Sequence, residues 1–243
     1  MKSVGIIGFG SFGRFLAEKL SSYAKVYVYS ASGKASSWAA SIEEIAVCDY
    51  IIPAIPLASY RDVLGQLKPH LAQRAVIVDV CSVKVTPLAI IRDVLPDQPV
   101  VATHPMFGPE SASVSLEGHT IVMCPDVSAE EPYGLLRTYL TSVGLDVREM
   151  TLEEHDREIA VVQGLTFFVA RTLETMGIHD QQLHTPSFSR LLKLAELEHH
   201  HSQELFETIQ VGNPLTTDVR KRFLATAEQI HAELEEESHQ RNQ

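Results

Sequence analysis

The sequence predicts an α/β protein, with a doubly wound, mostly parallel sheet in residues 1–150 and an all-helical domain in residues 151–243. Two observations predict this fold class. Short β-branched apolar runs alternate with amphipathic helical patterns as far as Met150, which is typical of parallel strands wrapped by helices. From Thr151 onward the strand pattern stops and long helical patterns remain. We therefore place a domain boundary near Thr151.

Seven apolar runs predict the strands of the first domain. They are VGIIG (4–8), KVYVYS (25–30), DYIIPAI (49–55), AVIVDV (75–80), PVVATH (99–104), HTIVMC (119–124) and LDVREM (145–150). Apolar residues near i, i+3 and i+4 predict helices between them, in RFLAEKLSS, ASYRDVLGQL, PLAIIRDVL and EPYGLLRTYL.

Three helical patterns follow the boundary. EEHDREIAVVQGLTFFVARTLETMGI predicts one long helix, and PSFSRLLKLAELEHHHSQELFETIQ and TDVRKRFLATAEQIHAELEEE predict further helices, with VGNP between them. A segment this small buries little surface by itself. We therefore expect a homodimer formed through residues 151–243.

Charge and cysteine content exclude several classes of protein. The formal net charge is −11, from 31 acidic and 20 basic residues, which argues against a nucleic-acid partner. Cys48, Cys81 and Cys124 form no CxxC pair, so a reducing cytoplasm is expected. The chain starts with a strand pattern and has no apolar run near ~18 residues, so we expect neither a signal peptide nor a membrane partner. His199, His200 and His201 are consecutive and point apart on a helix, so no metal site is predicted.

The glycine-rich loop near the N-terminus predicts a dinucleotide site. Gly8, Gly10 and Gly13 have the spacing G-x-G-x-x-G, behind a strand and ahead of a helix. Such a loop lets the backbone approach a pyrophosphate at the helix N-terminus, as in the Rossmann fold. The alternative is a glycine turn without a nucleotide. The expected cofactor-binding residues are Gly8, Phe9, Gly10, Ser11, Phe12 and Gly13.

The end of the second strand favours NADP over NAD. An NAD site usually has an acidic residue about 20 residues after the glycine loop, and it binds the ribose 2′-hydroxyl. No acidic residue occurs between Glu18 and Glu43. Ser30, Ser32 and Lys34 stand there instead and can bind a 2′-phosphate. The alternative is a solvated polar turn with loose choice between NADP and NAD.

Candidate catalytic residues follow the fourth and fifth strands, whose carboxyl ends line the ligand crevice of such a sheet. Ser82 and Lys84 follow the fourth strand, and His104 ends the fifth. Neutral histidine suits the removal of a hydroxyl proton, so activity should fall on acidification with an apparent pKa near ~6.5. The alternative for His104 is a histidine that caps a loop.

Four motifs in order behind GFGSFG resemble the TyrA family of prephenate and arogenate dehydrogenases, and most closely its plant-type arogenate dehydrogenases. They are DVCSVK, HPMFGPESA, EEHDREIAVVQ and TPSFSR. The resemblance implies a Rossmann domain joined to a helical dimerisation domain, and oxidative decarboxylation of prephenate or arogenate in tyrosine biosynthesis. It implies that His104 contacts the ring hydroxyl and that Ser82 binds this histidine. It further implies that Arg190 binds a substrate carboxylate and that Gln163 faces the substrate. Lys84 and Arg171 are further cations for an anionic substrate.

One departure from the family keeps alternatives open. Phe167 stands where the family often has a histidine, and a phenyl ring donates no hydrogen bond. Another two-domain NADP oxidoreductase, of the β-hydroxyacid dehydrogenase or imine reductase type, is one alternative. The hydroxyacid enzymes use a lysine on the long helix, and AVVQGLTFFVARTLETMGI contains none. A non-catalytic NADP-binding protein is the other alternative.

Overall fold

The computed structural model describes residues 1–31, 33, 36–196 and 201–241. Contacts between Cα atoms divide the chain into two compact units, Met1–His155 and Asp156–Gln243. The boundary predicted near Thr151 lies just before this division. The functions predicted for the two segments stay predictions.

The first unit is built on one seven-stranded sheet with the order β2-β1-β3-β4-β5-β6-β7. All neighbouring pairs are parallel except β5 and β6, which are antiparallel. Every apolar run that predicted a strand forms one, and the sheet is of the Rossmann type. The strands are β1 (Ser3–Ile7), β2 (Lys25–Tyr29), β3 (Tyr50–Pro53), β4 (Val76–Asp79), β5 (Val100–Pro105), β6 (Thr120–Cys124) and β7 (Asp146–Glu149).

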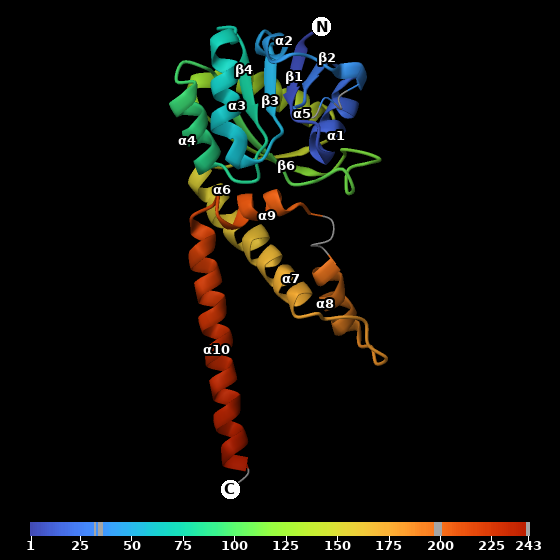
Figure 1. Ribbon diagram of the computed structural model, residues 1–243, viewed down its shortest axis with the longest axis vertical. Helices are drawn as coiled ribbons and strands as arrows, with labels where there is room; N and C mark the ends of the chain where they lie inside the picture. Colours follow the sequence, from blue (N-terminus) through green and yellow to red (C-terminus); the bar gives the residue numbers. More distant parts are fainter. Residues whose placement is uncertain (32, 34–35, 197–200, 242–243) are drawn as a thin grey trace. The chain divides into compact units, whose positions relative to one another are not determined.

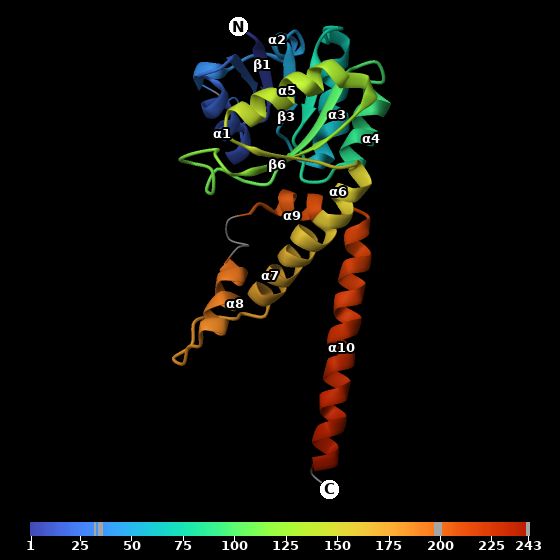
Figure 2. The same cartoon turned by 180° about the vertical axis from the view of Figure 1, so that it is seen from behind.

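Helices cover both faces of this sheet, because successive side chains of a strand point to opposite faces. Ile51 of β3 belongs to a core cluster with residues of α2, α3 and α4, whereas its neighbour Ile52 packs on the other face with residues of α1 and α5. Figure 1 shows α3 and α4 in front of the sheet, and Figure 2 shows α1 and α5 across its other face. The helices are α1 (Ser11–Leu20), α2 (Ile42–Ala46), α3 (Tyr60–Leu67), α4 (Val85–Val94) and α5 (Glu130–Ser142).

The long helix predicted after the boundary is divided by a π-helical turn at Ala160–Leu165. The segment is helical from Leu152 to Thr175, as predicted, and its middle is π-helical. Two side chains of the segment before α10 donate to backbone carbonyls of this helix. Gln210 Nε2 donates to the carbonyl of Gly164 at 2.7 Å, and Asn213 Nδ2 donates to the carbonyl of Asp156 at 2.6 Å. Around this turn lie α6 (Leu152–Ile159), α7 (Thr166–Thr175), α8 (Pro186–Glu196), α9 (Gln203–Gln210) and α10 (Leu215–Arg241).

Gly164 allows the π-helical turn to approach α10 closely. A Cβ atom at this position would lie 2.7 Å from the side chain of Thr216, so a larger residue would force the two elements apart. In the part of the chain that the structure describes, no helix is long and apolar enough to cross a membrane.

Candidate active site

The glycine loop between β1 and α1 has the shape of a phosphate cradle. Gly8 adopts φ +108°, a conformation that favours glycine, and its N–H donates to the carbonyl of Tyr29 at 2.8 Å. A Cβ atom on Gly8 would collide with the carbonyl oxygen of Ala54, and one on Gly13 would collide with that of Gly8. A Cβ atom on Gly10 would meet nothing within 4 Å. Two glycines therefore hold the turn closed, and the third leaves open space at the N-terminus of α1, where a pyrophosphate fits.

The other predicted residues of this loop surround the cradle. Ser11 is the exposed first residue of α1, and this helix has no acidic residue in its first turn to repel a phosphate. Phe12 is half-buried, with its ring centroid 5.9 Å from that of Phe15. Phe9 is half-buried beside Trp38, at a centroid distance of 6.1 Å.

Of the three residues expected at a 2′-phosphate, the structure describes only Ser30. It directly follows β2 and is half-buried, and its carbonyl accepts the N–H of Gly33 at 2.9 Å. Ser32 and Lys34 lie outside the described residues. Their contact with a cofactor stays a prediction.

His104, near the end of β5, is paired with a second histidine. Its Nδ1 lies 2.8 Å from Nε2 of His155, and the two rings meet edge to face with centroids 5.1 Å apart. His104 is 2% exposed and His155 is fully buried. Sequence reasoning did not identify this pair.

Burial keeps His104 neutral. It lowers the pKa of this imidazole well below its usual 6.5, and the neighbouring His155 and the ammonium of Lys84 lower it further. The expectation of an apparent pKa near ~6.5 for activity is therefore corrected to a lower value. If Nδ1 carries the ring proton and donates it to His155, Nε2 is an acceptor, and no described residue bonds to it.

The hydrogen bond expected between Ser82 and His104 is absent among the described residues. Ser82 is half-buried after β4, and the Nδ1 atom of His104 is already bonded to His155. A direct role for the Ser82 hydroxyl toward the substrate stays a prediction.

Lys84 is not at the surface of a crevice. Its side chain and that of Asp79 are fully buried and form an ion pair. The ammonium also donates to the carbonyl of Thr103, which joins the ends of β4 and β5. Asp79 further accepts from the hydroxyl of Tyr60 at 2.9 Å and from the N–H of Cys81 at 3.2 Å. This placement contradicts the substrate contact predicted for Lys84, because the ammonium is used inside the protein.

In the second unit, Gln163 lies in the π-helical turn and is a candidate for ligand binding. Its Oε1 atom is buried and has no hydrogen-bond partner among the described residues. Buried polar atoms are normally paired, so this acceptor is free for a donor from a ligand. π-Helical turns are frequent at functional sites.

One turn further along, Phe167 is 6% exposed and packs edge to face against His201, with ring centroids 4.6 Å apart. The structure thus places an imidazole beside the phenyl ring at this position. His199 and His200 lie outside the described residues.

The two arginines of the second unit differ in their surroundings. Arg190 is exposed on α8. Arg171 lies over the ring of Phe206, with Cζ 4.1 Å from the ring centroid, and donates to Gln203 Oε1 at 3.0 Å. Arg190 is therefore the more accessible of the two for an anionic ligand.

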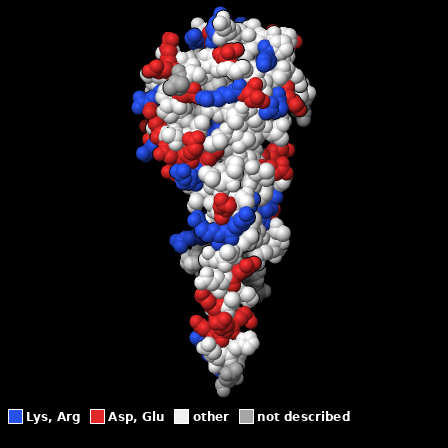
Figure 3. All heavy atoms as spheres, turned by 90° about the vertical axis from the view of Figure 1, so that its left-hand side faces the viewer, with Lys and Arg blue, Asp and Glu red and all other residues white. Residues whose placement is uncertain are grey.

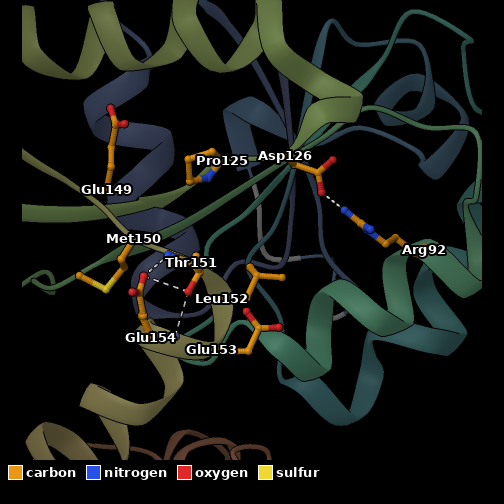
Figure 4. A pocket seen from close by; sticks show the side chains of 9 residues that line it. All are labelled: Arg92, Pro125, Asp126, Glu149, Met150, Thr151, Leu152, Glu153 and Glu154. Carbon is orange, nitrogen blue, oxygen red and sulfur yellow. Dashed lines mark hydrogen bonds and ion pairs between the residues drawn. The ribbon is translucent and has the colours of Figure 1, made fainter.

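A pocket of about 530 Å³ lies beside the beginning of α6 in the first unit (Figure 4). Arg92 pairs with Asp126 there, and Glu154 Oε2 accepts from the backbone N–H and the hydroxyl of Thr151, both at 2.9 Å. The glycine loop, Ser82 and His104 do not line this pocket. Four carboxylates against one guanidinium make it unsuited to an anionic substrate. It is lined by Arg92, Pro125, Asp126, Glu149, Met150, Thr151, Leu152, Glu153 and Glu154.

Comparisons with known proteins find prephenate and arogenate dehydrogenases among the proteins similar to this chain. Residues 31–148 match the family described as prephenate dehydrogenase, nucleotide-binding domain. Arogenate dehydrogenase 2, chloroplastic, of Arabidopsis thaliana is 28% identical over 98% of this chain and 71% of its own length. Arogenate dehydrogenase 1, chloroplastic, of the same plant is 28% identical over 95% of this chain but only 39% of its own length. The prephenate dehydrogenase of A. aeolicus, solved with hydroxyphenyl propionate and NAD⁺, has a TM-score of 0.71 at 23% identity, over 98% of this chain and 93% of that one.

The Rossmann sheet and its glycine loop define the class, a protein with a dinucleotide-binding domain. Within that class, the family match and the two plant relatives agree with the motifs around Ser82 and His104. The chain is similar to the prephenate and arogenate dehydrogenases of the TyrA family, in its nucleotide-binding residues 31–148 and in its plant relatives.

Proposed function

We propose that this chain oxidises and decarboxylates prephenate or arogenate in tyrosine biosynthesis, with NADP as the preferred cofactor. The observation that carries the proposal is the buried, neutral imidazole of His104, whose Nε2 is free while Nδ1 is bonded to His155. This is the state that a general base requires.

The reaction requires one proton acceptor, and it requires the substrate to be positioned against the nicotinamide. A bound nicotinamide supplies the hydride acceptor. His104 Nε2 takes the proton of the ring hydroxyl as the ring carboxylate leaves as CO₂ and the ring becomes aromatic. The imidazolium that forms donates its Nδ1–H to His155 Nε2, 2.8 Å away, and this hydrogen bond stabilises the new charge. Ser82 is proposed to contact the substrate from the end of β4.

The substrate is an anion, and residues of the second unit are proposed to hold it. Arg190 is exposed and suited to a carboxylate. The buried, unpartnered Oε1 of Gln163 is suited to a donor group of the substrate. Lys84 is left out of this set because its ammonium is paired with Asp79.

The glycine loop fits the cofactor, because Gly10 leaves room for a pyrophosphate at the N-terminus of α1. NADP is favoured over NAD because no acidic residue lies between Glu18 and Glu43 to bind the ribose 2′-hydroxyl or repel a 2′-phosphate. Ser30, at the end of β2, is the described residue proposed to assist.

Nicotinamide reduction measured with both acids and both cofactors tests the proposal. We expect turnover of at least one of the two acids, and higher kcat/KM for NADP than for NAD. Tight binding of NADP without turnover of either acid would support the non-catalytic alternative instead. Faster turnover with NAD would refute the cofactor preference alone.

We also infer that the active protein is a homodimer formed through its second unit. Every residue of α10 from Lys221 to Arg241 is exposed, and apolar side chains recur along it at Phe223, Ile230 and Leu234. A lone helix of this kind gains little stability in water, so a partner surface is expected. Figure 3 shows basic side chains toward the beginning of α10 and acidic ones toward its end, which suits antiparallel pairing of two copies.

The three cysteines, Cys48, Cys81 and Cys124, are free thiols. We propose a reducing compartment, the cytoplasm, as the setting of the protein, since disulfides are rare there.

A further inference from the structure

Three side chains at the glycine loop form a cluster, and two of them, Arg14 and Trp38, have no role in the proposed function. The rings of Phe9 and Trp38 lie 6.1 Å apart at 55° to each other. The guanidinium of Arg14 lies over Phe9, with Cζ 5.2 Å from the ring centroid. Both rings are partly buried against the core on one side of the sheet, and Arg14 is exposed. Phe9, Arg14 and Trp38 are called the arginine–aromatic cluster below.

The arginine–aromatic cluster lies at the carboxyl ends of β1 and β2. The N–H of Gly8, at the end of β1, donates to Tyr29, the last residue of β2. The segment that carries Trp38 runs beside β2, because Ala39 forms a bridge with Val28 and the N–H of Ala40 donates to the Val28 carbonyl at 3.0 Å. In a Rossmann sheet the adenosine half of a dinucleotide lies at this end, over the first two strands.

The charge of Arg14 is available to a ligand. Among the described residues, no carboxylate lies within ion-pair distance of the Arg14 guanidinium. The guanidinium groups of Arg61, Arg92 and Arg137, in contrast, each pair with a carboxylate. The chain from residue 19 to residue 42 carries no acidic residue that competes for it. Stacking on Phe9 orients the planar guanidinium and leaves its N–H groups free. Two of these N–H groups can donate to the same phosphate.

We propose that Arg14 binds the 2′-phosphate of NADP and that Trp38 and Phe9 form the wall against which the adenosine packs. The inference rests on the proposed binding of a dinucleotide. It assigns to Arg14 the preference for NADP over NAD. Arg14 supplies the positive charge at a site without an acidic residue, and the aromatic rings provide a stacking surface that serves NADP and NAD alike.

The single tryptophan of the chain makes this testable without turnover. Trp38 is the only tryptophan, so its fluorescence reports on the arginine–aromatic cluster alone. The full-length protein is titrated with NADP, NAD, 2′,5′-ADP and 5′-AMP, and the fluorescence of Trp38 is followed in parallel with calorimetry. The variant is Arg14→Gln. The matched control is Arg148→Gln, an exposed arginine on β7 at the far edge of the sheet from β2.

We expect Arg14→Gln to weaken binding of NADP and 2′,5′-ADP by about tenfold to a hundredfold, the loss of a charge-assisted bidentate contact. Binding of NAD and 5′-AMP should change by less than about twofold, since neither carries the phosphate. Arg148→Gln should leave all four ligands unaffected. Trp38→Phe should keep most of the affinity for NADP and NAD, and Trp38→Ala should weaken the binding of both.

Two results would overturn the inference while leaving the proposed function intact. One is wild-type affinity for NADP in Arg14→Gln. The other is calorimetric binding of NADP with no change in the fluorescence of Trp38. Failure of the wild-type protein to bind either dinucleotide would reject both the inference and the proposed function. Because Arg14 is exposed, the Arg14→Gln variant should fold. A thermal unfolding midpoint equal to that of the wild-type protein checks this.

Discussion

Replacing Lys84 with methionine should destabilise the first unit without acting on substrate affinity. The change removes an ammonium that is fully buried and paired with Asp79, and it leaves the Asp79 carboxylate buried without its counter-ion. Breaking such a pair costs about 3–5 kcal/mol in the free energy of unfolding. Asp79 keeps the hydrogen bonds from Tyr60 and Cys81, so we expect a value of about 3 kcal/mol, at the low end of that range.

Urea unfolding followed by the fluorescence of Trp38 measures this loss, because the only tryptophan lies in the first unit. Asp79→Asn added to Lys84→Met should recover most of the stability, since the amide carries no charge and its oxygen still accepts from Tyr60. Lys68→Met, at an exposed lysine, is the matched control. A Lys84→Met protein of wild-type stability with a raised KM would show that the lysine contacts substrate and that the reasoning is wrong.

Three further predictions concern the histidine pair and the second unit. His155→Phe should lower kcat by about 5- to 100-fold at constant KM, because the buried Nδ1–H of His104 loses its acceptor at a cost of ~1–3 kcal/mol. His155→Gln should restore part of the rate, and equal rates in both variants would reject a positioning role. Ile230→Glu with Leu234→Glu should convert a dimer into a monomer of 26.9 kDa by light scattering, and a wild-type monomer with full activity would exclude the dimer. Because the pKa of folded His104 is lowered, its contribution to stability is complete above ~6.5 and is lost progressively as the pH falls below that value. Urea unfolding over a pH series checks this, with His104→Asn expected to show a weaker dependence.

Sequence reasoning identified the sheet because its signals are local. Each strand is a short apolar run such as AVIVDV, bounded by turn or helix signals, and each became a strand. The π-helical turn at Ala160–Leu165 could not be predicted in this way. Its side-chain contacts come from Gln210 and Asn213, whose amides donate to backbone carbonyls of this helix more than forty residues earlier in the chain.

The candidate site was predicted in part, for the same physical reason. Gly8 follows β1 and His104 lies near the end of β5, so the sheet itself indicated that both residues lie at the carboxyl ends of its strands. The partner of His104 could not be read from spacing, because His155 comes from a helix 51 residues later. Lys84 did leave a signal that was missed. Asp79 stands inside an apolar strand, and a buried carboxylate requires a cation close by.

The proton taken by His104 is the central claim, and His104→Asn tests it most directly. Asparagine keeps much of the shape but provides no base at pH 7. In steady-state assays with NADP, kcat should fall by about 10² to 10⁴, the usual contribution of a positioned general base. NADP binding, measured by calorimetry, should be unchanged, because the glycine loop is untouched. The fall in wild-type activity at acidic pH, expected below ~6.5 because burial lowers the pKa of His104, should disappear in the variant. A His104→Asn enzyme with near-normal kcat and the same acid limb would contradict the account, since another group would then take the proton.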